Sequence, residues 1–315
     1  MLLDYFPENI KSKLMKGSLK IPGKIQEIRL TVNSPPEVIT TQNRFFINHQ
    51  GKKIKNVNKS EFRINKQDIE RAVILLSDNS VYALERQLRE GFITLPGGHR
   101  VGFTGEVVTE NRSIKTIKNI NSLNYRFTRE VTGPGSKIFP HLLNKNREFV
   151  STLIISPPLC GKTTLLRDLV RVLSEGVSAI GYEGVRVGVV DERSEIGGAY
   201  RGVSQNDLGP RTDLLDNCPK SEGMMLLIRS MSPQVIAVDE IGGSQEITAL
   251  REAVRTGVRL LATIHGSDVK KVQERPGVKY LFEKKLFERF IVLSRKQGPG
   301  TVESIKTIRG KELWL

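Results

Sequence analysis

Short, strongly apolar runs recur through the second half of the chain, and stretches with a helical period lie between them. The runs cover residues 152–155, 186–190, 235–238, 259–264 and 290–293. Short apolar runs bounded by polar or turn-forming residues are typical of strands buried on both faces, as the strands of parallel sheets are. Their alternation with helices therefore predicts an α/β fold with a mainly parallel sheet flanked by helices.

The first half of the chain follows a different pattern. Shorter β-like runs at residues 26–32, 37–40 and 44–47 come before a helix-period stretch at 66–76, and a second helix is expected at 82–90. Strands grouped ahead of helices, rather than alternating with them, are typical of mixed α+β domains. The two halves of the chain are therefore expected to fold differently.

Residues 131–136, Val-Thr-Gly-Pro-Gly-Ser, combine glycine and proline with small polar side chains, which is typical of a linker. The chain has 315 residues, of which 38% are hydrophobic and 26% charged, and this length and composition suit a globular protein of two domains. We therefore expect a smaller mixed α+β domain at residues 1–133 and an α/β domain at residues 134–315.

The junction after the run at 152–155 has the composition of a phosphate-binding loop. It ends in Gly-Lys-Thr-Thr and leads into a helix-period stretch, which is the strand–loop–helix context of a P-loop. Backbone N–H groups of such a loop surround the β-phosphate of a nucleotide, and the helix dipole adds positive potential. The residues expected to bind the nucleotide are Ser156, Pro157, Pro158, Leu159, Cys160, Gly161, Lys162, Thr163 and Thr164.

Two side chains of this loop have specific expected roles. Lys162 is expected to reach the β- and γ-phosphates, and the Thr163 hydroxyl is expected to bind Mg²⁺. The loop departs from the usual motif in that Ser156 occupies the position of the first glycine, and Pro157 and Pro158 remove two N–H donors. The alternative is an ordinary strand–turn–helix that contains an incidental Gly-Lys-Thr.

Acidic residues follow two of the apolar runs. Asp239 and Glu240 come directly after one of them. Asp239 is expected to bind Mg²⁺, and Glu240 to polarise the attacking water as a general base. Asp191 and Glu192 come after another run, where Asp191 is expected near the metal and Glu192 near the water. Taken alone, such pairs also fit solvated or salt-bridged turns.

Thr263 lies in the run at 259–264 and His265 directly follows it, and both are expected where a γ-phosphate could be sensed. A purely structural histidine is the alternative for His265. Ligands of open α/β sheets bind outside the carboxyl ends of the strands, so the loop and these polar residues should lie at one edge. Together they predict a Mg²⁺-dependent site for a nucleoside triphosphate.

The chain is basic, and most of the excess charge lies outside the expected nucleotide site. The net charge is +15, and residues 1–150 contain 25 Lys and Arg against 14 Asp and Glu, a net charge of +11. Such an excess suits nucleic acid, an anionic membrane surface or an acidic partner. Solvated lysines around loops are the alternative.

The sequence favours a cytoplasmic protein. No apolar run approaches the roughly 18 residues of a membrane span, and the acid and proline within the first seven residues do not fit a secretory signal. The two cysteines, Cys160 and Cys218, form no disulfide framework. Because oxidation of Cys160 would block the phosphate loop, a reducing compartment is expected.

Several segments resemble a known branch of P-loop ATPases. The segments are, with the loop, Asp191-Glu192-Arg193, Arg229-Ser-Met-Ser-Pro233, Val238-Asp239-Glu240 and Ala262-Thr-Ile-His265-Gly266. In this order they are similar to the ATPases of type II and type IV secretion and of pili. Segments Glu27–Leu30, Leu95–Gly102, Gly202–Asp207 and Asn217–Pro219 extend the resemblance to the stage III sporulation protein AA family. Within that family the Ser-Pro-Pro start of the loop looks normal.

The resemblance implies a RecA-like core that hydrolyses ATP with Mg²⁺. It further implies a homo-oligomer, expected as a hexamer, whose sites lie near subunit or domain boundaries. Arginines of the N-terminal domain then reach the phosphates, and Arg100, Arg126 and Arg129 match by position. Ion pairs with acids of the domain interface are the alternative role for these arginines.

The family further implies a motor, docked from the cytoplasm on a membrane-embedded channel component, for transport between mother cell and forespore. Two other functions remain open at this point. One is a nucleic-acid-dependent ATPase that grips phosphates with its basic half, although no nucleic-acid-binding module is visible in the sequence. The other is an assembly scaffold that is gated by ATP and barely hydrolyses it.

Overall fold

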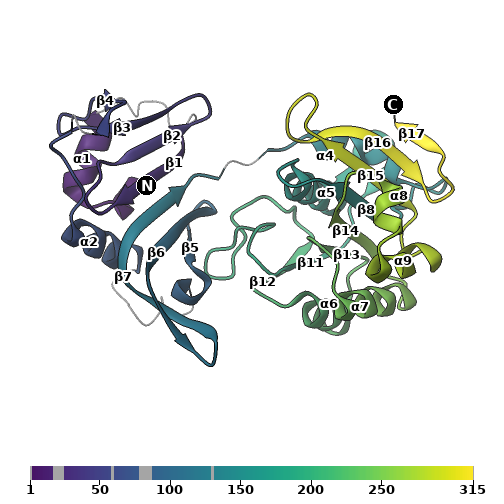
Figure 1. Ribbon diagram of the computed structural model, residues 1–315. Helices are drawn as coiled ribbons and strands as arrows, with labels where there is room; N and C mark the ends of the chain where they lie inside the picture. The colour runs from purple at the N-terminus through teal and green to yellow at the C-terminus, as the bar shows by residue number, and fades with distance from the viewer. Residues whose placement is uncertain (1, 17–24, 58–59, 78–86, 129–130, 315) are drawn as a thin grey trace. The chain divides into compact units, whose positions relative to one another are not determined.

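The computed structural model describes residues 2–16, 25–57, 60–77, 87–128 and 131–314 (Figure 1). The chain forms two compact units, Met1–Arg129 and Glu130–Leu315. The helix predicted at 82–90 lies partly outside the described residues, and residues 87–90 are helical. Each unit has its own sheet and its own buried core.

The described part of the N-terminal unit contains a seven-stranded antiparallel sheet with the order β4-β3-β2-β1-β7-β6-β5. The strands are β1 (Ile25–Thr31), β2 (Glu37–Thr40), β3 (Arg44–Ile47), β4 (Lys53–Ile54), β5 (Phe92–Leu95), β6 (His99–Glu110) and β7 (Ser113–Arg126). The helices are the 3-10 helix η1 (Leu2–Tyr5) and the α-helices α1 (Glu8–Lys16) and α2 (Lys66–Leu76). The three predicted β-like runs correspond to β1, β2 and β3, and the predicted helix at 66–76 to α2.

One face of this sheet is apolar, because successive side chains of a strand point to opposite faces. Ile28 of β1 packs in a buried cluster with Ile10 of α1 and Ile69 of α2. The neighbouring positions are polar: Arg29 of β1 and Arg126 of β7 are exposed. The sheet therefore buries one face against the two helices and keeps charged side chains on the other.

The described part of the C-terminal unit contains an eight-stranded sheet with the order β12-β11-β13-β14-β8-β15-β16-β17. The first six strands are parallel, and β16 and β17 are antiparallel. The strands are β8 (Thr152–Ser156), β11 (Val187–Asp191), β12 (Thr212–Asp216), β13 (Val235–Val238), β14 (Arg259–His265), β15 (Arg289–Ser294), β16 (Thr301–Thr307) and β17 (Glu312–Trp314). A separate ribbon pairs β9 (Gly176–Val177) with β10 (Tyr182–Glu183).

The fold is α/β, as the sequence predicts, and each of the five apolar runs is a strand of this sheet. The pattern misses β12, β16 and β17, because these strands are partly exposed and mix polar with apolar residues. Antiparallel pairings are more numerous than parallel ones across the described residues, since the N-terminal sheet is antiparallel throughout. The expectation of a mainly parallel sheet therefore applies to the C-terminal unit alone.

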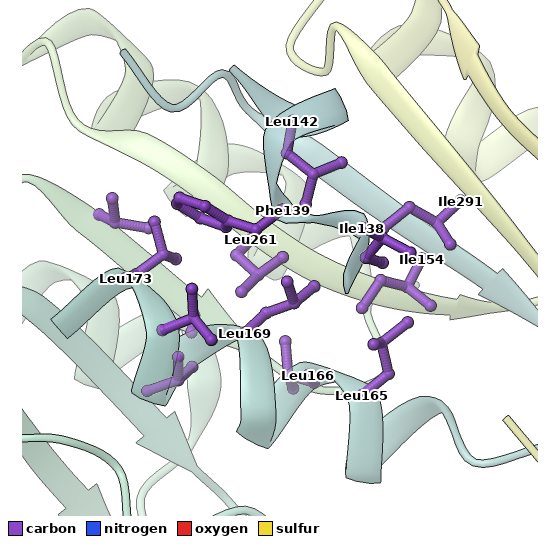
Figure 2. Close-up of a cluster of buried hydrophobic side chains, with 14 of the residues drawn as sticks. Ile138, Phe139, Leu142, Ile154, Leu165, Leu166, Leu169, Leu173, Leu261 and Ile291 are labelled. Carbon is purple, nitrogen blue, oxygen red and sulfur yellow. The ribbon is translucent and has the colours of Figure 1, made fainter. Parts of the chain in front are cut away.

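Helices cover both faces of the C-terminal sheet (Figure 1). They are α4 (Pro134–Ile138), η4 (Phe139–Leu142), α5 (Lys162–Glu175), η5 (Ser178–Ile180), α6 (Lys220–Ser230), α7 (Ser244–Arg255), α8 (Val269–Gln273) and α9 (Pro276–Glu283). Figure 2 shows Ile154 of β8 among Leu166 and Leu169 of α5 and Phe139 of η4. Leu153, the preceding residue of β8, belongs to the buried cluster on the opposite face.

The stretch predicted as a linker at 131–136 is partly helical, because α4 begins at Pro134. One carboxylate oxygen of Asp168 on α5 accepts the N–H groups of Gly133 at 2.9 Å and Gly135 at 2.6 Å. Arg171 donates to the other oxygen at 2.8 Å. This buried carboxylate therefore attaches the start of α4 to α5, the helix that follows the predicted phosphate loop.

Substitution of Leu169 by alanine should destabilise the C-terminal unit, because Leu169 is fully buried between α5 and the sheet. We expect a loss of about 2–5 kcal/mol in the free energy of unfolding, measured by urea denaturation and the fluorescence of the single tryptophan, Trp314. Leu226→Ala on α6 is the matched control, since Leu226 is 52% exposed. Equal losses in both variants would contradict this packing.

Candidate active site

Parallel pairing brings the carboxyl ends of four strands to one edge of the C-terminal sheet. β11, β13, β14 and β8 are successive neighbours. His265 at the end of β14 is in register with Ser156 at the end of β8, and Val238 of β13 with Ala262 of β14. The segments that follow these strands, including the predicted phosphate loop, therefore start from the same edge.

The loop between β8 and α5 contains two residues in the left-handed backbone region. Leu159 has φ of 59° and Gly161, which precedes the first residue of α5, has φ of 83°. The N–H of Gly300, in the loop between β15 and β16, donates to the carbonyl of Cys160 at 2.9 Å. A Cβ at Gly161 would lie 3.0 Å from the nitrogen of Gly300. Glycine at position 161 therefore permits both the backbone turn and this close approach.

The first positions of this loop offer few donors. Pro157 and Pro158 have no N–H group. Ser156 is fully buried, and its hydroxyl donates to the carbonyl of Pro157 at 2.8 Å. The backbone donors available to a phosphate therefore begin after the two prolines, toward the N-terminus of α5.

Lys162 lies within hydrogen-bonding distance of two predicted catalytic residues. Its Nζ donates to Oε2 of Glu240 at 3.2 Å and lies 3.2 Å from Nε2 of His265. Nε2 of His265 is also 3.0 Å from Oε1 of Glu240. Burial alone would raise the pKa of Glu240, but the hydrogen bond and the charge of Lys162 lower it below its ordinary value. Glu240 is therefore an anion at neutral pH, with Lys162 as its counter-ion.

Asp239 and Thr163, both predicted to bind Mg²⁺, are in direct contact. The Thr163 hydroxyl donates to Oδ2 of Asp239 at 2.6 Å, and the hydroxyl of Thr263 donates to Oδ1. Mg²⁺ in nucleotide sites is held by one or two protein oxygens together with phosphates and water. Thr163 and Asp239 are adjacent oxygen donors of this kind, so the residues present fit the ion.

Asp191 and Glu192 have partners that the sequence did not suggest. Asp191 is buried, and its two oxygens accept the N–H groups of Glu195, Ile196 and Gly197, each at 2.8 Å. Glu192 forms an ion pair with Lys220 at 3.2 Å. Asp191 therefore fixes the turn after β11, and the predicted roles of both residues beside the metal and the water stay predictions.

The predicted N-terminal arginines belong to the other unit. Arg100 of β6 is paired in register with Arg126 of β7, and the guanidinium of Arg100 lies 4.7 Å from the ring centre of Phe92. Arg129 lies outside the described residues. The contact of these arginines with phosphates stays a prediction.

Lys220 contacts Glu240 but is absent from the predicted set, whereas Thr263 is predicted beside His265, and its role in sensing phosphate stays a prediction. Lys220 is the first residue of α6, and Thr263 is a buried residue of β14. A lysine at a helix N-terminus opposes the helix dipole. That local conflict does not single out Lys220, because Lys66 and Lys162 also begin helices. The sequence therefore contains no specific signal for Lys220.

Asp191 should make the stability of the C-terminal unit depend on pH. Burial raises the pKa of Asp191 to about 6, from 3.8, despite the backbone hydrogen bonds that oppose the shift. The native state then binds the proton more tightly than the unfolded state, so this contribution to stability falls as pH rises from about 4 to about 6, by up to about 3 kcal/mol. Asp191→Asn removes this contribution.

The measurement is the free energy of unfolding of wild type and of Asp191→Asn between pH 4 and pH 7. We expect the wild type to lose stability relative to the variant as pH rises through this interval. A difference that is independent of pH would contradict the burial of an ionisable carboxyl at this position.

Residues 4–313 of the chain match the model of a protein family described as "Sporulation stage III, protein AA". Stage III sporulation protein AA of Bacillus subtilis (strain 168) is 40% identical over 304 residues, which cover 96% of this chain and 94% of that protein. An uncharacterized protein, ycf45, of Cyanidium caldarium is 32% identical over 160 residues, which cover 50% of this chain and 44% of that protein.

Two solved structures have a similar fold. The Legionella pneumophila ATPase DotB has a TM-score of 0.53 at 16% identity, over 90% of this chain and 73% of that chain. The pilus retraction motor PilT with bound ADP has a TM-score of 0.56 at 14% identity, over 90% of this chain and 76% of that chain. At this identity the likeness shows a shared fold alone.

Among the described residues, no helix has the length and apolar character needed to span a bilayer. The family match runs from residue 4 to residue 313, and the Bacillus subtilis relative is similar over nearly its whole length. The chain therefore belongs to the stage III sporulation protein AA family, and it shares its fold with DotB and PilT.

Proposed function

We propose that the chain is a Mg²⁺-dependent ATPase, the motor of a secretion-like channel complex that acts between mother cell and forespore in endospore formation. The observation that carries the proposal is the meeting of Lys162, Glu240 and His265 beside the Thr163–Asp239 pair. Family membership supports the role in sporulation, and the fold shared with ATPases supports the chemistry.

Each residue then has a role in hydrolysis. When ATP binds, the ammonium group of Lys162 leaves the Glu240 carboxylate and contacts the γ-phosphate instead. The Glu240 carboxylate is then able to accept a hydrogen bond from the attacking water. His265 lies beside Lys162 and Glu240 and senses the γ-phosphate through them. Thr163 and Asp239 would hold Mg²⁺, which supplies positive charge to the phosphate oxygens.

We further propose that the protein acts as a ring, expected to be a hexamer, docked from the cytoplasm on a membrane-embedded channel component. Arg100, Arg126 or Arg129 would neutralise charge on the transferred phosphoryl group, which a planar guanidinium does well. The net charge of +11 over residues 1–150 supports an anionic surface or an acidic partner for this part of the chain.

Lys162→Ala and Glu240→Gln should each lower ATP turnover by at least about 100-fold, because each removes a preorganised group from the reaction. Glu240→Gln should still bind ATP, whereas Lys162→Ala should bind it more weakly. The measurements are phosphate release and binding of a fluorescent ATP analogue. Lys279→Ala, an exposed lysine on α9, is the control. Turnover within a few fold of wild type in both site variants would refute the proposed site.

If an arginine of a neighbouring protomer completes each site, turnover per protomer should rise with protein concentration. Under this proposal, one of Arg100→Ala, Arg126→Ala and Arg129→Ala is inactive, and mixing it with Lys162→Ala restores part of the turnover. Some sites of the mixed ring then combine an intact loop with an intact arginine. Concentration-independent turnover, with no restoration on mixing, would place the whole site in one protomer.

A further inference from the structure

Lys220 is a largely buried cation with three acceptors. Its Nζ donates to the backbone carbonyl of Glu240 at 2.9 Å and contacts Glu246 at 3.1 Å and Glu192 at 3.2 Å. Only 12% of its side chain is exposed. An ammonium group has three N–H donors, so these contacts use all of them. Lys220 thereby joins the end of β11, the start of α6, the segment after β13 and the start of α7.

The backbone of Glu240 needs this support. Glu240 has φ of 56°, in the left-handed region that is unfavourable for residues with a Cβ. Its N–H donates to the Thr263 hydroxyl at 2.8 Å, and its carbonyl accepts from Lys220. Both backbone groups of Glu240 are therefore held by side chains of other elements, while its own carboxylate extends to Lys162.

Glu246 connects the same cation to the segment after Glu240. One carboxylate oxygen accepts the N–H groups of Gly242 at 2.7 Å and Gly243 at 2.9 Å, and the other contacts Lys220. Burial disfavours the charge of Lys220, but the hydrogen bonds and charges of Glu246 and Glu192 raise the pKa of Lys220 above its ordinary value. Lys220 is therefore charged at neutral pH, and residues 240–243 are held by one continuous network.

We propose that Lys220 is a positioning residue for ATP hydrolysis, which holds the carbonyl of Glu240 so that the carboxylate keeps its place beside Lys162. This inference rests on the function proposed above. Without Lys220, the left-handed turn at Glu240 loses one of its two restraints and relaxes toward a more favourable backbone conformation. Misplacement of a catalytic group by about 1 Å can cost about 100-fold in rate.

Lys220→Met tests the proposal, because methionine keeps most of the apolar volume and removes the donors. We expect kcat to fall by about 10- to 100-fold per folded protomer, while KM and the affinity for an ATP analogue stay within about 3-fold. Arg171→Met is the matched control: Arg171 is 14% exposed and pairs with the buried Asp168 in the same unit. It should lower stability and leave kcat per folded protomer unchanged.

Hydrogen exchange gives a readout that does not depend on turnover. The N–H groups of Glu240, Ile241, Gly242 and Gly243 are all hydrogen-bonded. In Lys220→Met their exchange should accelerate by at least about 10-fold at matched stability, while strand β13 stays protected. Arg171→Met should leave these amides unchanged. If Lys220→Met does not fold, Lys220→Met/Glu246→Gln, which avoids an unpaired buried carboxylate, is measured instead.

The outcomes separate the two proposals. A wild type that binds ATP without hydrolysing it would refute the proposed ATPase, and the exchange of residues 240–243 would then decide the role of Lys220 alone. Unchanged exchange in Lys220→Met would overturn the positioning role even in an active enzyme. A fall in kcat shared equally by Lys220→Met and Arg171→Met would overturn it as well.

Discussion

Parallel pairing of β8, β14 and β13 holds together groups that lie far apart in the chain. Lys162 and Glu240 are 78 residues apart, and Lys162 and His265 are 103 residues apart. Their side chains meet because each follows a strand that ends at the same edge of the sheet. The apolar residues that bury these strands on both faces are therefore a condition for any chemistry at this edge.

Two buried ammonium groups act on different parts of Glu240. Lys162 contacts its carboxylate, and Lys220 contacts its backbone carbonyl. Under the proposed function, phosphates would compete with Glu240 for Lys162, whereas the three acceptors of Lys220 all belong to the protein. Lys162 is thus suited to change partners during a reaction. Lys220 is suited to keep the backbone of Glu240 in place while Lys162 changes partners.

Buried carboxylates hold two segments of the C-terminal unit through backbone N–H groups. Asp191 accepts from three successive residues of the turn after β11, and Asp168 accepts from Gly133 and Gly135 ahead of α4. A buried carboxylate is stable only when its oxygens are satisfied, so each of these contacts selects one loop conformation. At the turn after β11, which lies beside the candidate site, such preorganisation lowers the reorganisation that binding or catalysis would require.

The chain by itself determined the α/β class, the five buried strands and the polar residues at the strand ends, because apolar periodicity is a local signal. The Gly-Lys-Thr motif is local as well, and it predicts the phosphate loop. The sequence did not reveal β12, β16 and β17, whose partial exposure leaves no clear period. The role of Asp191 near a metal stays a prediction, and no local pattern indicated the backbone N–H groups that contact both of its oxygens.

Lys220 escaped prediction for a related reason. Its three acceptors come from Glu192, Glu240 and Glu246, and they converge only when the sheet and helices have packed. Local sequence thus determined which residue types follow each strand. The partners of each buried charge were decided by the tertiary structure alone, because a hydrogen bond depends on the final positions of both groups.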